Sequence, residues 1–240
     1  MARGRTTFVL IHGAWGGGWN YQRVAESLRA QGHVVYAPSL TGCGERAHLF
    51  SGAVNLSMHI QDVINIFKYE SIERAVLVGH SYGGMVITGT ADRIPEKISA
   101  LVYLDAFLPE NGQSIWDINI PANTARYLAS AGGHGGYSIP APAASFWNLN
   151  AADVPLYEQL TGPHPLPCFT ERVKLSGAGA SIGKRIYVWA TELGRPSPFK
   201  QFYDRCKADA AWETHALACG HEVMLDMPER TTEILLGAAS

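Results

Sequence analysis

The chain carries few charges, no long apolar run and no excess of basic residues. Charged residues make up 17% of the 240 residues, below the roughly 25% of an average domain, which argues against a disordered chain. Lys+Arg 19 and Asp+Glu 21 leave a formal net charge of -2, so a surface that binds nucleic-acid phosphates is not expected. No apolar run approaches the ~20 residues of a membrane-spanning helix. The composition therefore predicts a globular protein with no nucleic-acid and no membrane partner.

The chain also lacks closely spaced cysteine pairs. Its four cysteines are far apart and form no Cys-x-x-Cys motif: Cys43, Cys168, Cys206 and Cys219. This spacing favours neither a disulfide framework nor a zinc site, and it fits a reducing compartment. His221-Glu222 matches the beginning of a zinc-protease motif, but the second histidine of that motif does not follow. We therefore expect a cytoplasmic protein and no metal.

Short apolar segments alternate with segments of helical spacing along most of the chain. The predicted strands cover residues 7–11, 33–37, 75–79, 98–104, 185–189 and 211–217. The predicted helices cover residues 19–29, 82–92 and 197–207, and two more begin at Ser57 and Pro228. Strands that are apolar on both faces and separated by helices indicate a parallel sheet covered on both sides. The sequence thus predicts an α/β fold with a mostly parallel, doubly wound sheet.

The alternation stops after Leu104 and returns near Arg185. The intervening segment is rich in Pro, Gly and Ala and contains scattered aromatic residues. It is too long for a plain connection between two strands. We therefore predict a core made of residues 1–105 and 182–240, with residues 106–181 inserted as a cap.

Residues 79–83 read Gly-His-Ser-Tyr-Gly, a G-x-S-x-G motif that follows an apolar strand and opens a helix. This context is typical of a nucleophile elbow, in which a sharp turn exposes the serine hydroxyl above the sheet. Larger residues than glycine at 79 and 83 would collide in so tight a turn. The motif predicts Ser81 as a nucleophile. The alternative is an ordinary strand-to-helix turn that happens to contain serine.

Residues 12–18 read His-Gly-Ala-Trp-Gly-Gly-Gly and follow the first predicted strand. A glycine-rich turn at this place could bind a dinucleotide or a phosphate, but neither the G-x-G-x-x-G nor the Gly-Lys-Ser/Thr spacing is present. We therefore expect no cofactor. The turn instead fits an oxyanion hole, formed by the backbone N–H groups of Ala14 and of Tyr82.

A serine hydroxyl needs a base, and His221 is the candidate. It follows the last predicted strand, and the carboxyl ends of parallel strands share one edge of the sheet. Ser81 and His221 should therefore lie at the same edge. His12 and His80 flank the site in sequence, and we interpret both as packing residues.

Two acidic residues could orient His221. Asp105 ends the strand that follows the serine-bearing strand. The order Ser81, Asp105, His221 is the chain order of serine, acid and histidine in enzymes with a nucleophile elbow. Glu192 lies after the next strand in a polar turn, where it could simply be solvated. We favour Asp105, because a carboxylate at the end of an apolar strand requires a partner.

These motifs resemble the α/β-hydrolase superfamily. The resemblance is carried by residues 8–15 (FVLIHGAW), 40–46 (LTGCGER) and 78–85 (VGHSYGGM), and by Gly220-His221. Within the superfamily the chain is most similar to the branch that holds plant methylesterases, hydroxynitrile lyases and related bacterial carboxylesterases. The resemblance implies a cofactor-free serine hydrolase with a lid over its site.

The chain departs from that branch at two positions. The plant members carry an Asp after the penultimate strand, where residues 189–192 here read Trp-Ala-Thr-Glu. The cyanohydrin lyases of that branch, which resemble this chain, carry a lysine directly after the catalytic histidine, where this chain has Glu222. An anionic neighbour would oppose cyanide formation, so the second departure favours an esterase over a lyase.

The sequence as a whole predicts a serine carboxylesterase for small apolar or aromatic esters. Aromatic residues near the motif and in the insertion are the predicted substrate contacts: Trp15, Trp116 and Tyr127. The rival functions are a hydroxynitrile lyase on the same fold and a non-catalytic protein that binds a small ligand. The sequence leaves open whether the chain forms a homodimer.

Overall fold

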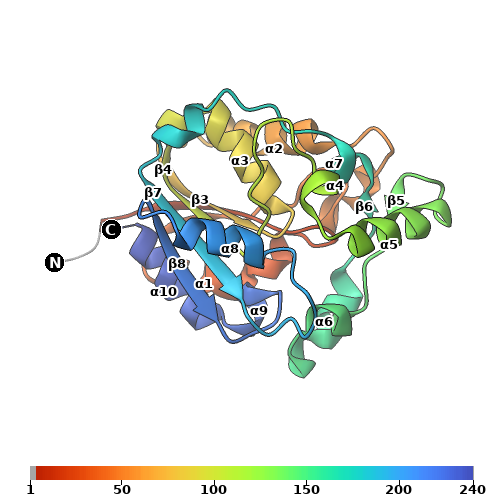
Figure 1. Ribbon diagram of the computed structural model, residues 1–240. Helices are drawn as coiled ribbons and strands as arrows, with labels where there is room; N and C mark the ends of the chain where they lie inside the picture. Colours follow the sequence, from red (N-terminus) through yellow and green to blue (C-terminus); the bar gives the residue numbers. More distant parts are fainter. Residues whose placement is uncertain (1–3, 240) are drawn as a thin grey trace.

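A parallel sheet of six strands forms the centre of the computed structural model, which describes residues 4–239 (Figure 1). In spatial order the strands are β2 (Val34–Tyr36), β1 (Thr7–Ile11), β3 (Ala75–His80), β4 (Ile98–Leu104), β7 (Lys184–Ala190) and β8 (Trp212–Leu217). All neighbours are parallel. The strand order reverses between β1 and β3, and the carboxyl ends at such a switch point border a crevice in which α/β proteins bind ligands.

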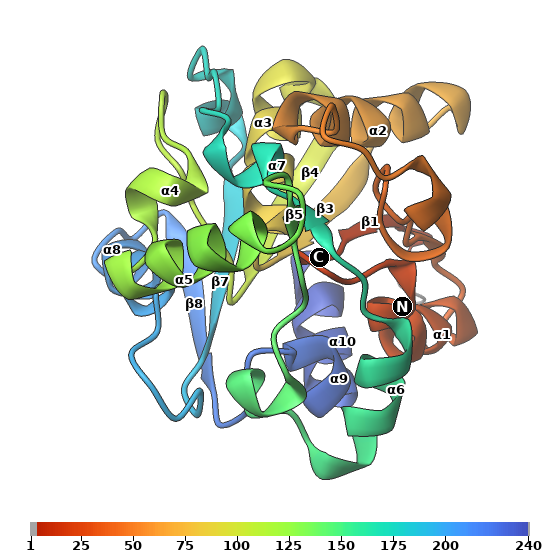
Figure 2. The same ribbon diagram turned by 90° about the vertical axis from the view of Figure 1, so that its right-hand side faces the viewer.

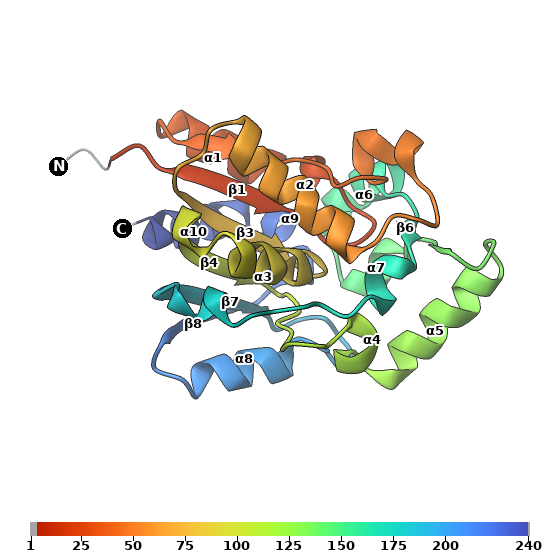
Figure 3. The same cartoon turned by 90° about the horizontal axis from the view of Figure 1, so that it is seen from above.

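Helices cover both faces of the sheet, as the apolar strands predict (Figures 1 and 3). One face packs against α2 (Leu56–Tyr69), α3 (Gly83–Arg93) and α8 (Lys200–Lys207), and the other against α1 (Gln22–Ala30) and α10 (Pro228–Ala238). Alternation along β4 illustrates the two faces. Leu101 and Tyr103 belong to the first hydrophobic cluster, whereas Val102 and Leu104 belong to the second. Burial on both sides accounts for the continuous apolar runs of the sequence.

Most of the segment between β4 and β7 lies over the carboxyl ends of the strands, and its last part returns along α3 to the amino end of β7 (Figures 1 and 2). Its elements are short: α4 (Ile115–Ile118), α5 (Pro121–Gly132), β5 (Ser138–Ile139), η4 (Ala144–Trp147), η5 (Ala151–Asp153), α6 (Val154–Leu160), β6 (His164–Pro165), α7 (Pro167–Thr170) and η6 (Ala178–Ser181). β5 and β6 pair antiparallel. Tyr127, Trp147 and Phe169 of this segment pack in the same hydrophobic cluster as Leu77 of the sheet. The segment therefore shares its core with the sheet.

Several predicted boundaries differ from the structure. The helix predicted over residues 19–29 divides into the 3-10 helix η1 (Gly18–Tyr21) and α1. The helix predicted from Ser197 begins only at Lys200, because the hydroxyl of Ser197 accepts the N–H of Phe199 in a preceding turn. Outside the segment between β4 and β7, three further short helices of the described chain were not predicted: η2 (Gly44–Leu49), η3 (Pro95–Lys97) and α9 (Val223–Asp226). Within residues 4–239, no helix is long and apolar enough to cross a bilayer.

Candidate active site

Ser81 occupies a strained turn between β3 and α3. Its φ is 52°, in the left-handed region that residues with a side chain rarely adopt. A Cβ atom at position 79 would lie 2.7 Å from the carbonyl oxygen of Gly83, and one at position 83 would lie 2.6 Å from that of Ile11. Glycine is therefore required on both sides of the serine, as the motif indicates. The turn raises Ser81 above the end of β3.

The loop after β1 packs directly against this turn. A Cβ atom on Gly13 would come within 3.0 Å of the Cβ of Ser81, so only glycine allows so close an approach. Ala14, Ser81 and Tyr82 line one common cavity. Tyr82 also stands at the N-terminal end of α3, where the helix dipole favours negative charge. The two residues predicted to form an oxyanion hole are thus brought to the cavity beside Ser81.

His221 and Asp105 form a buried hydrogen-bonded pair. Nδ1 of His221 lies 2.7 Å from Oδ2 of Asp105, and neither side chain is more than 2% exposed. The other carboxylate oxygen of Asp105 accepts the N–H of Ala190 at 3.2 Å. With Nδ1–H donated to Asp105, the free lone pair of the imidazole lies on Nε2, the arrangement a general base needs.

His221 stands next to the residue that precedes the serine. Nε2 of His80 lies 2.9 Å from the carbonyl oxygen of His221, and the two ring centroids are 4.5 Å apart. Burial and the positive charge of Arg195 lower the pKa of His221. Burial raises the pKa of Asp105, whereas the N–H of Ala190 and the charge of Arg195 lower it. His221 is therefore neutral near pH 7, the form that accepts a proton.

Glu192, the other candidate acid, lies on the exposed turn after β7. Its contacts within the described chain are made by its backbone: the N–H donates to Cys219, and the carbonyl oxygen accepts the side-chain amide of Asn148 at 2.6 Å. Of the two predicted acids, Asp105 is the one bonded to His221.

Two aromatic rings hold His221 in place. Phe199 stacks on the imidazole at 4.8 Å with an interplanar angle of 8°, and Trp147 at 4.6 Å with an angle of 28°. The N–H of His221 also donates to the carbonyl oxygen of Trp147. Neither ring was predicted from the sequence, because both come from irregular segments that only the fold brings to this edge.

A narrow cavity lies beside Ser81. Its lining is mostly aromatic and apolar: Ala14, Trp15, Tyr82, Phe107, Ile115, Tyr127, Trp147, Phe169, Pro198 and Phe199, with the polar residues Ser81, Asn119, Asn123 and Arg195. Trp15 and Tyr127 thus lie where the sequence predicts substrate contacts. Trp116 is not among these lining residues of the described chain, and it packs, half-buried, against the outside of the hydrophobic cluster.

Glu222 lies behind the site rather than in it. Its carboxyl group accepts the side-chain amide of Asn20 at 3.1 Å and lies 3.9 Å from Nδ1 of His80. Burial raises its pKa to about 8, and the nearby Asp226 adds to this effect. Glu222 therefore contacts Asn20 and His80, it is not among the residues that line the cavity, and burial favours its neutral form.

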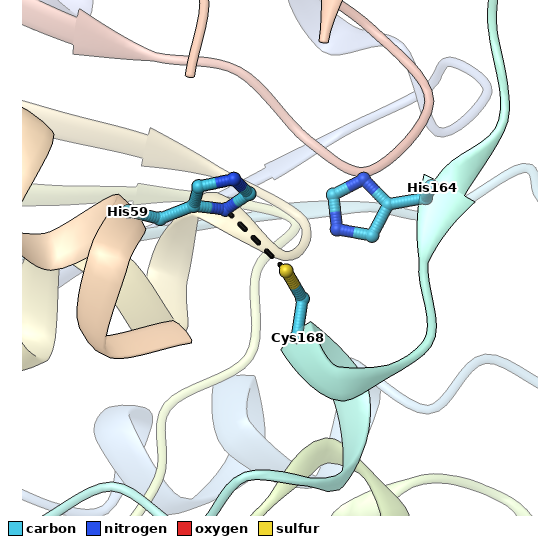
Figure 4. A group of neighbouring side chains, drawn as sticks. All are labelled: His59, His164 and Cys168. Carbon is cyan, nitrogen blue, oxygen red and sulfur yellow. Dashed lines mark hydrogen bonds between the residues drawn. The ribbon is translucent and has the colours of Figure 1, made fainter. Parts of the chain in front are cut away.

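Three residues behind Tyr82 could hold a soft metal ion: His59, His164 and Cys168 (Figure 4). Their donor atoms lie within 4.8 Å of one another, and Nε2 of His164 has no hydrogen-bond partner within residues 4–239. Nδ1 of His59 is 2.8 Å from the hydroxyl of Tyr82, and its Nε2 is 2.8 Å from the carbonyl oxygen of Thr41. In this structure the cluster therefore supports the side chain of Tyr82.

The fold and the site define a class of protein. A doubly wound parallel sheet, a strained serine after its third strand and a buried Asp–His pair at the same edge are the features of an α/β hydrolase. The chain belongs to the alpha/beta hydrolase family, whose model matches residues 8–234. The predicted fold and family are both confirmed.

Curated proteins match this chain to different extents, one along almost its whole length and another over less than half of it. The chain is 41% identical over 237 residues to the carbendazim hydrolyzing esterase of Nocardioides sp. (strain SG-4G), a match that covers 95% of this chain and 97% of that protein. It is 35% identical over 105 residues to salicylic acid-binding protein 2 of Nicotiana tabacum, covering 43% of this chain and 40% of that one.

Solved structures share the fold over nearly the whole chain. An extracellular alpha/beta-hydrolase from a Paenibacillus species superimposes with a TM-score of 0.85 at 24% identity, covering 97% of this chain and 98% of the other. A pyrethroid hydrolase from Sphingobium faniae JZ-2 superimposes with a TM-score of 0.78 at 25% identity, covering 98% of each chain.

Proposed function

We propose that the chain is a serine carboxylesterase in which Ser81, His221 and Asp105 form the catalytic triad. The 2.7 Å bond between His221 and Asp105, at the sheet edge that carries the strained Ser81, is the observation that supports this assignment most directly. The names of the relatives point the same way, since a 41% identical protein that aligns along almost its whole length is an esterase.

The reaction follows from the arrangement of the site. Nε2 of His221 takes the proton of Ser81 as its oxygen attacks the ester carbonyl carbon. The N–H groups of Ala14 and Tyr82 hold the resulting oxyanion. His221 then gives its proton to the departing alcohol, which leaves an acyl group on Ser81. Water, deprotonated by His221 in turn, releases the acid and restores the serine.

The substrate we propose is a small ester with an apolar or aromatic part. The cavity beside Ser81 is narrow and its lining is mostly apolar and aromatic, which favours a small ligand of that character. Its lining contains Trp15 and Tyr127, which we propose as substrate contacts, whereas Trp116 lies outside it. We further propose that residues 106–181 act as the cap that excludes water from this cavity.

The four unpaired, buried cysteines support a cytoplasmic location as part of the proposal. Fractionation of cells that express the tagged chain tests it. Recovery of the protein from the culture medium or from the periplasm would contradict that location.

A chromophoric ester tests the enzymatic assignment. The unmodified protein should release a burst of p-nitrophenolate from p-nitrophenyl acetate, and a serine-directed phosphonate should label Ser81. Ser81→Ala should keep the melting temperature and lose turnover by about 10⁴-fold or more, as removal of a triad serine does elsewhere. Binding without a burst would indicate a non-catalytic protein. Rapid cyanide release from mandelonitrile would indicate a lyase.

A further inference from the structure

Two arginine side chains meet on one ring at the cap side of the cavity. The guanidinium carbon of Arg195 lies 3.4 Å from the centroid of Phe146, and that of Arg126 lies 4.0 Å from the same centroid. Arg195 lines the cavity that contains Ser81. Arg126 stacks in addition on Tyr127, another lining residue, at 4.6 Å. Two positive charges are therefore held beside the proposed substrate site.

No carboxylate pairs with either guanidinium group within residues 4–239. Nε of Arg195 donates to the carbonyl oxygen of Phe146 at 3.0 Å, and Nε and Nη2 of Arg126 are buried without a partner. Asp105 is the acid whose charge acts on Arg195, but its carboxylate is already bonded to His221 and Ala190. Both arginines are half-buried, and a partly desolvated charge without a counter-ion is costly, so this pair is suited to an anion that arrives with a ligand.

The polar lining beside Arg195 consists of amide groups. Oδ1 of Asn119 accepts the N–H of Ile120 at 2.8 Å and the side-chain amide of Asn123 at 3.1 Å. With its oxygen occupied twice, Asn119 interacts through its NH₂ group, which already bonds the hydroxyl of Tyr127 and has a second N–H to donate. Arg195 and Asn119 both line the cavity. This end of the cavity offers hydrogen-bond donors and positive charge, and the remaining lining is largely apolar.

Resting on the esterase activity proposed above, we infer that the preferred substrates are esters that also carry a carboxylate group, bound by Arg195 with Arg126 behind it and Asn119 beside it. A guanidinium group binds a carboxylate through two parallel hydrogen bonds, which fixes orientation as well as charge. The carboxylate takes no part in the reaction. Ser81 still attacks the ester carbonyl, and the alcohol still leaves.

Such binding would act on the base as well. The charge of Arg195 lowers the pKa of His221. A bound carboxylate neutralises that charge and makes His221 a stronger base while the substrate is in place. For a carboxylate-bearing ester, the acid limb of kcat should therefore lie at higher pH than that of kcat/KM, because kcat reports the complex and kcat/KM the free enzyme. A neutral ester should show no such separation.

A matched pair of esters tests the inference in the full-length protein. The p-nitrophenyl monoester of glutaric acid and p-nitrophenyl valerate have acyl chains of equal length and differ in the terminal carboxylate. The unmodified enzyme should hydrolyse the glutarate ester with the higher kcat/KM. Arg195→Gln should reduce the ratio of the two kcat/KM values by about 10-fold or more, the range of one hydrogen bond to a charged group. Arg195→Lys should restore part of it, and Arg126→Gln should reduce it less.

Arg230→Gln is the matched control, because Arg230 lies on α10 and pairs with Glu233 there. It should leave the ratio as it is. An unchanged ratio in Arg195→Gln, with both esters still hydrolysed, would overturn the carboxylate site and leave the esterase intact. Failure of the unmodified protein to hydrolyse either ester would instead overturn the proposed function. If Arg195→Gln does not fold, the ratio of the two kcat/KM values is measured for the unmodified protein with and without 1 M NaCl. The ratio should fall in the salt, where screening of charges is strong. A constant ratio would reject the inference.

Discussion

Asp105 adopts an uncommon backbone conformation that suits its place. Its φ is 41°, and its N–H donates to the carbonyl oxygen of Val188 at 2.7 Å. Asp and Asn tolerate the left-handed region better than most residues do. The turn therefore points a carboxylate back at His221 rather than continuing β4, and an Asn at this position would keep the same backbone.

Asp105→Asn should consequently fold normally and lose most of its activity. The amide can bond the wrong tautomer of His221, and such a change costs about 10⁴-fold in the Ser-His-Asp proteases. Glu192→Gln is the control and should cost little, since the side chain of Glu192 is exposed. Turnover of p-nitrophenyl acetate and the melting temperature are measured for both variants. A crippled Glu192→Gln beside an active Asp105→Asn would move the acid to the turn after β7.

The pH dependence of activity depends on His221. Burial and Arg195 lower its pKa from the ordinary value of 6.5. The base works when neutral, which is above its pKa, so activity should be lost as pH falls through a midpoint below 6.5. The measurement is kcat/KM for p-nitrophenyl acetate between pH 4 and 8, with circular dichroism at each pH to exclude unfolding. A midpoint above 6.5 would contradict the direction of the shift.

At the residue scale, the residues proposed for the triad and the oxyanion hole could be selected from the sequence because each sits at a fixed offset from a predicted strand. Ser81 and Asp105 directly follow strands, and His221 follows the last one. Arg195 and Trp147 could not be found in this way. They lie in irregular segments, and only tertiary packing decides which of their neighbours face the cavity.

The same distinction holds for secondary-structure elements. The inner parallel strands were predictable because burial on both faces makes them largely apolar runs, whereas the edge strand β8 contains polar residues and is mostly half-buried or exposed. The elements between β4 and β7 were less so, since α4 and α7 are four residues long and carry no periodic pattern. Helices this short do not form by their own propensity, and the packing of Phe169 and Ile115 into the main cluster stabilises them.

The loop after β1 contacts the elbow after β3, and a substitution at this contact should lower both activity and stability. Gly13→Ala would place a Cβ atom 2.8 Å from Nδ1 of His80 and 3.0 Å from the Cβ of Ser81. Since His80 is fully enclosed, the loop must move, and the oxyanion donor of Ala14 moves with it. We expect a loss of kcat of about 10²-fold, the lower range for one oxyanion donor, and a lower melting temperature.

Gly132→Ala provides the comparison. Gly132 ends α5, and a Cβ atom there would have no neighbour within 4 Å among the described residues. The alanine should leave kcat unchanged and keep or slightly raise the melting temperature, because alanine favours the helix. Equal activities of the two alanine variants would show that the position of the loop does not limit catalysis.

At the scale of the whole molecule, the active site is built across one continuous core. The cluster that contains Leu77 of the sheet also contains Trp15 of the loop after β1 and Tyr127 of the segment between β4 and β7. Both ends of the described chain lie at the end of the sheet opposite to α5 and α6 of that segment (Figure 1). Because these elements share one core, a substitution or ionisation of a buried group near the site should change the free energy of unfolding of the whole chain.

Glu222 is the group with which to measure that coupling. Its pKa is about 8 in the folded protein against an ordinary value of 4.5. The folded state therefore holds this proton more tightly than the unfolded state does. The associated stabilisation is complete below pH 4.5 and is lost as pH rises through about 8. Between pH 4.5 and 8 the melting temperature of the unmodified protein should fall, because the unfolded chain releases this proton while the folded chain, in which a buried charge is costly, retains it.

Glu222→Gln should remove this dependence. Glutamine has the shape of the protonated carboxyl group, and its oxygen can still accept the amide of Asn20, which bonds Glu222 at 3.1 Å. Melting temperatures of both proteins, measured by calorimetry at pH 4.5 and 8.5, should be similar at the lower pH and should favour the variant at the higher one. Other titrating groups cancel in the difference between the two proteins. Two curves that stay parallel across this range would show that Glu222 ionises as readily in the folded chain as in the unfolded one.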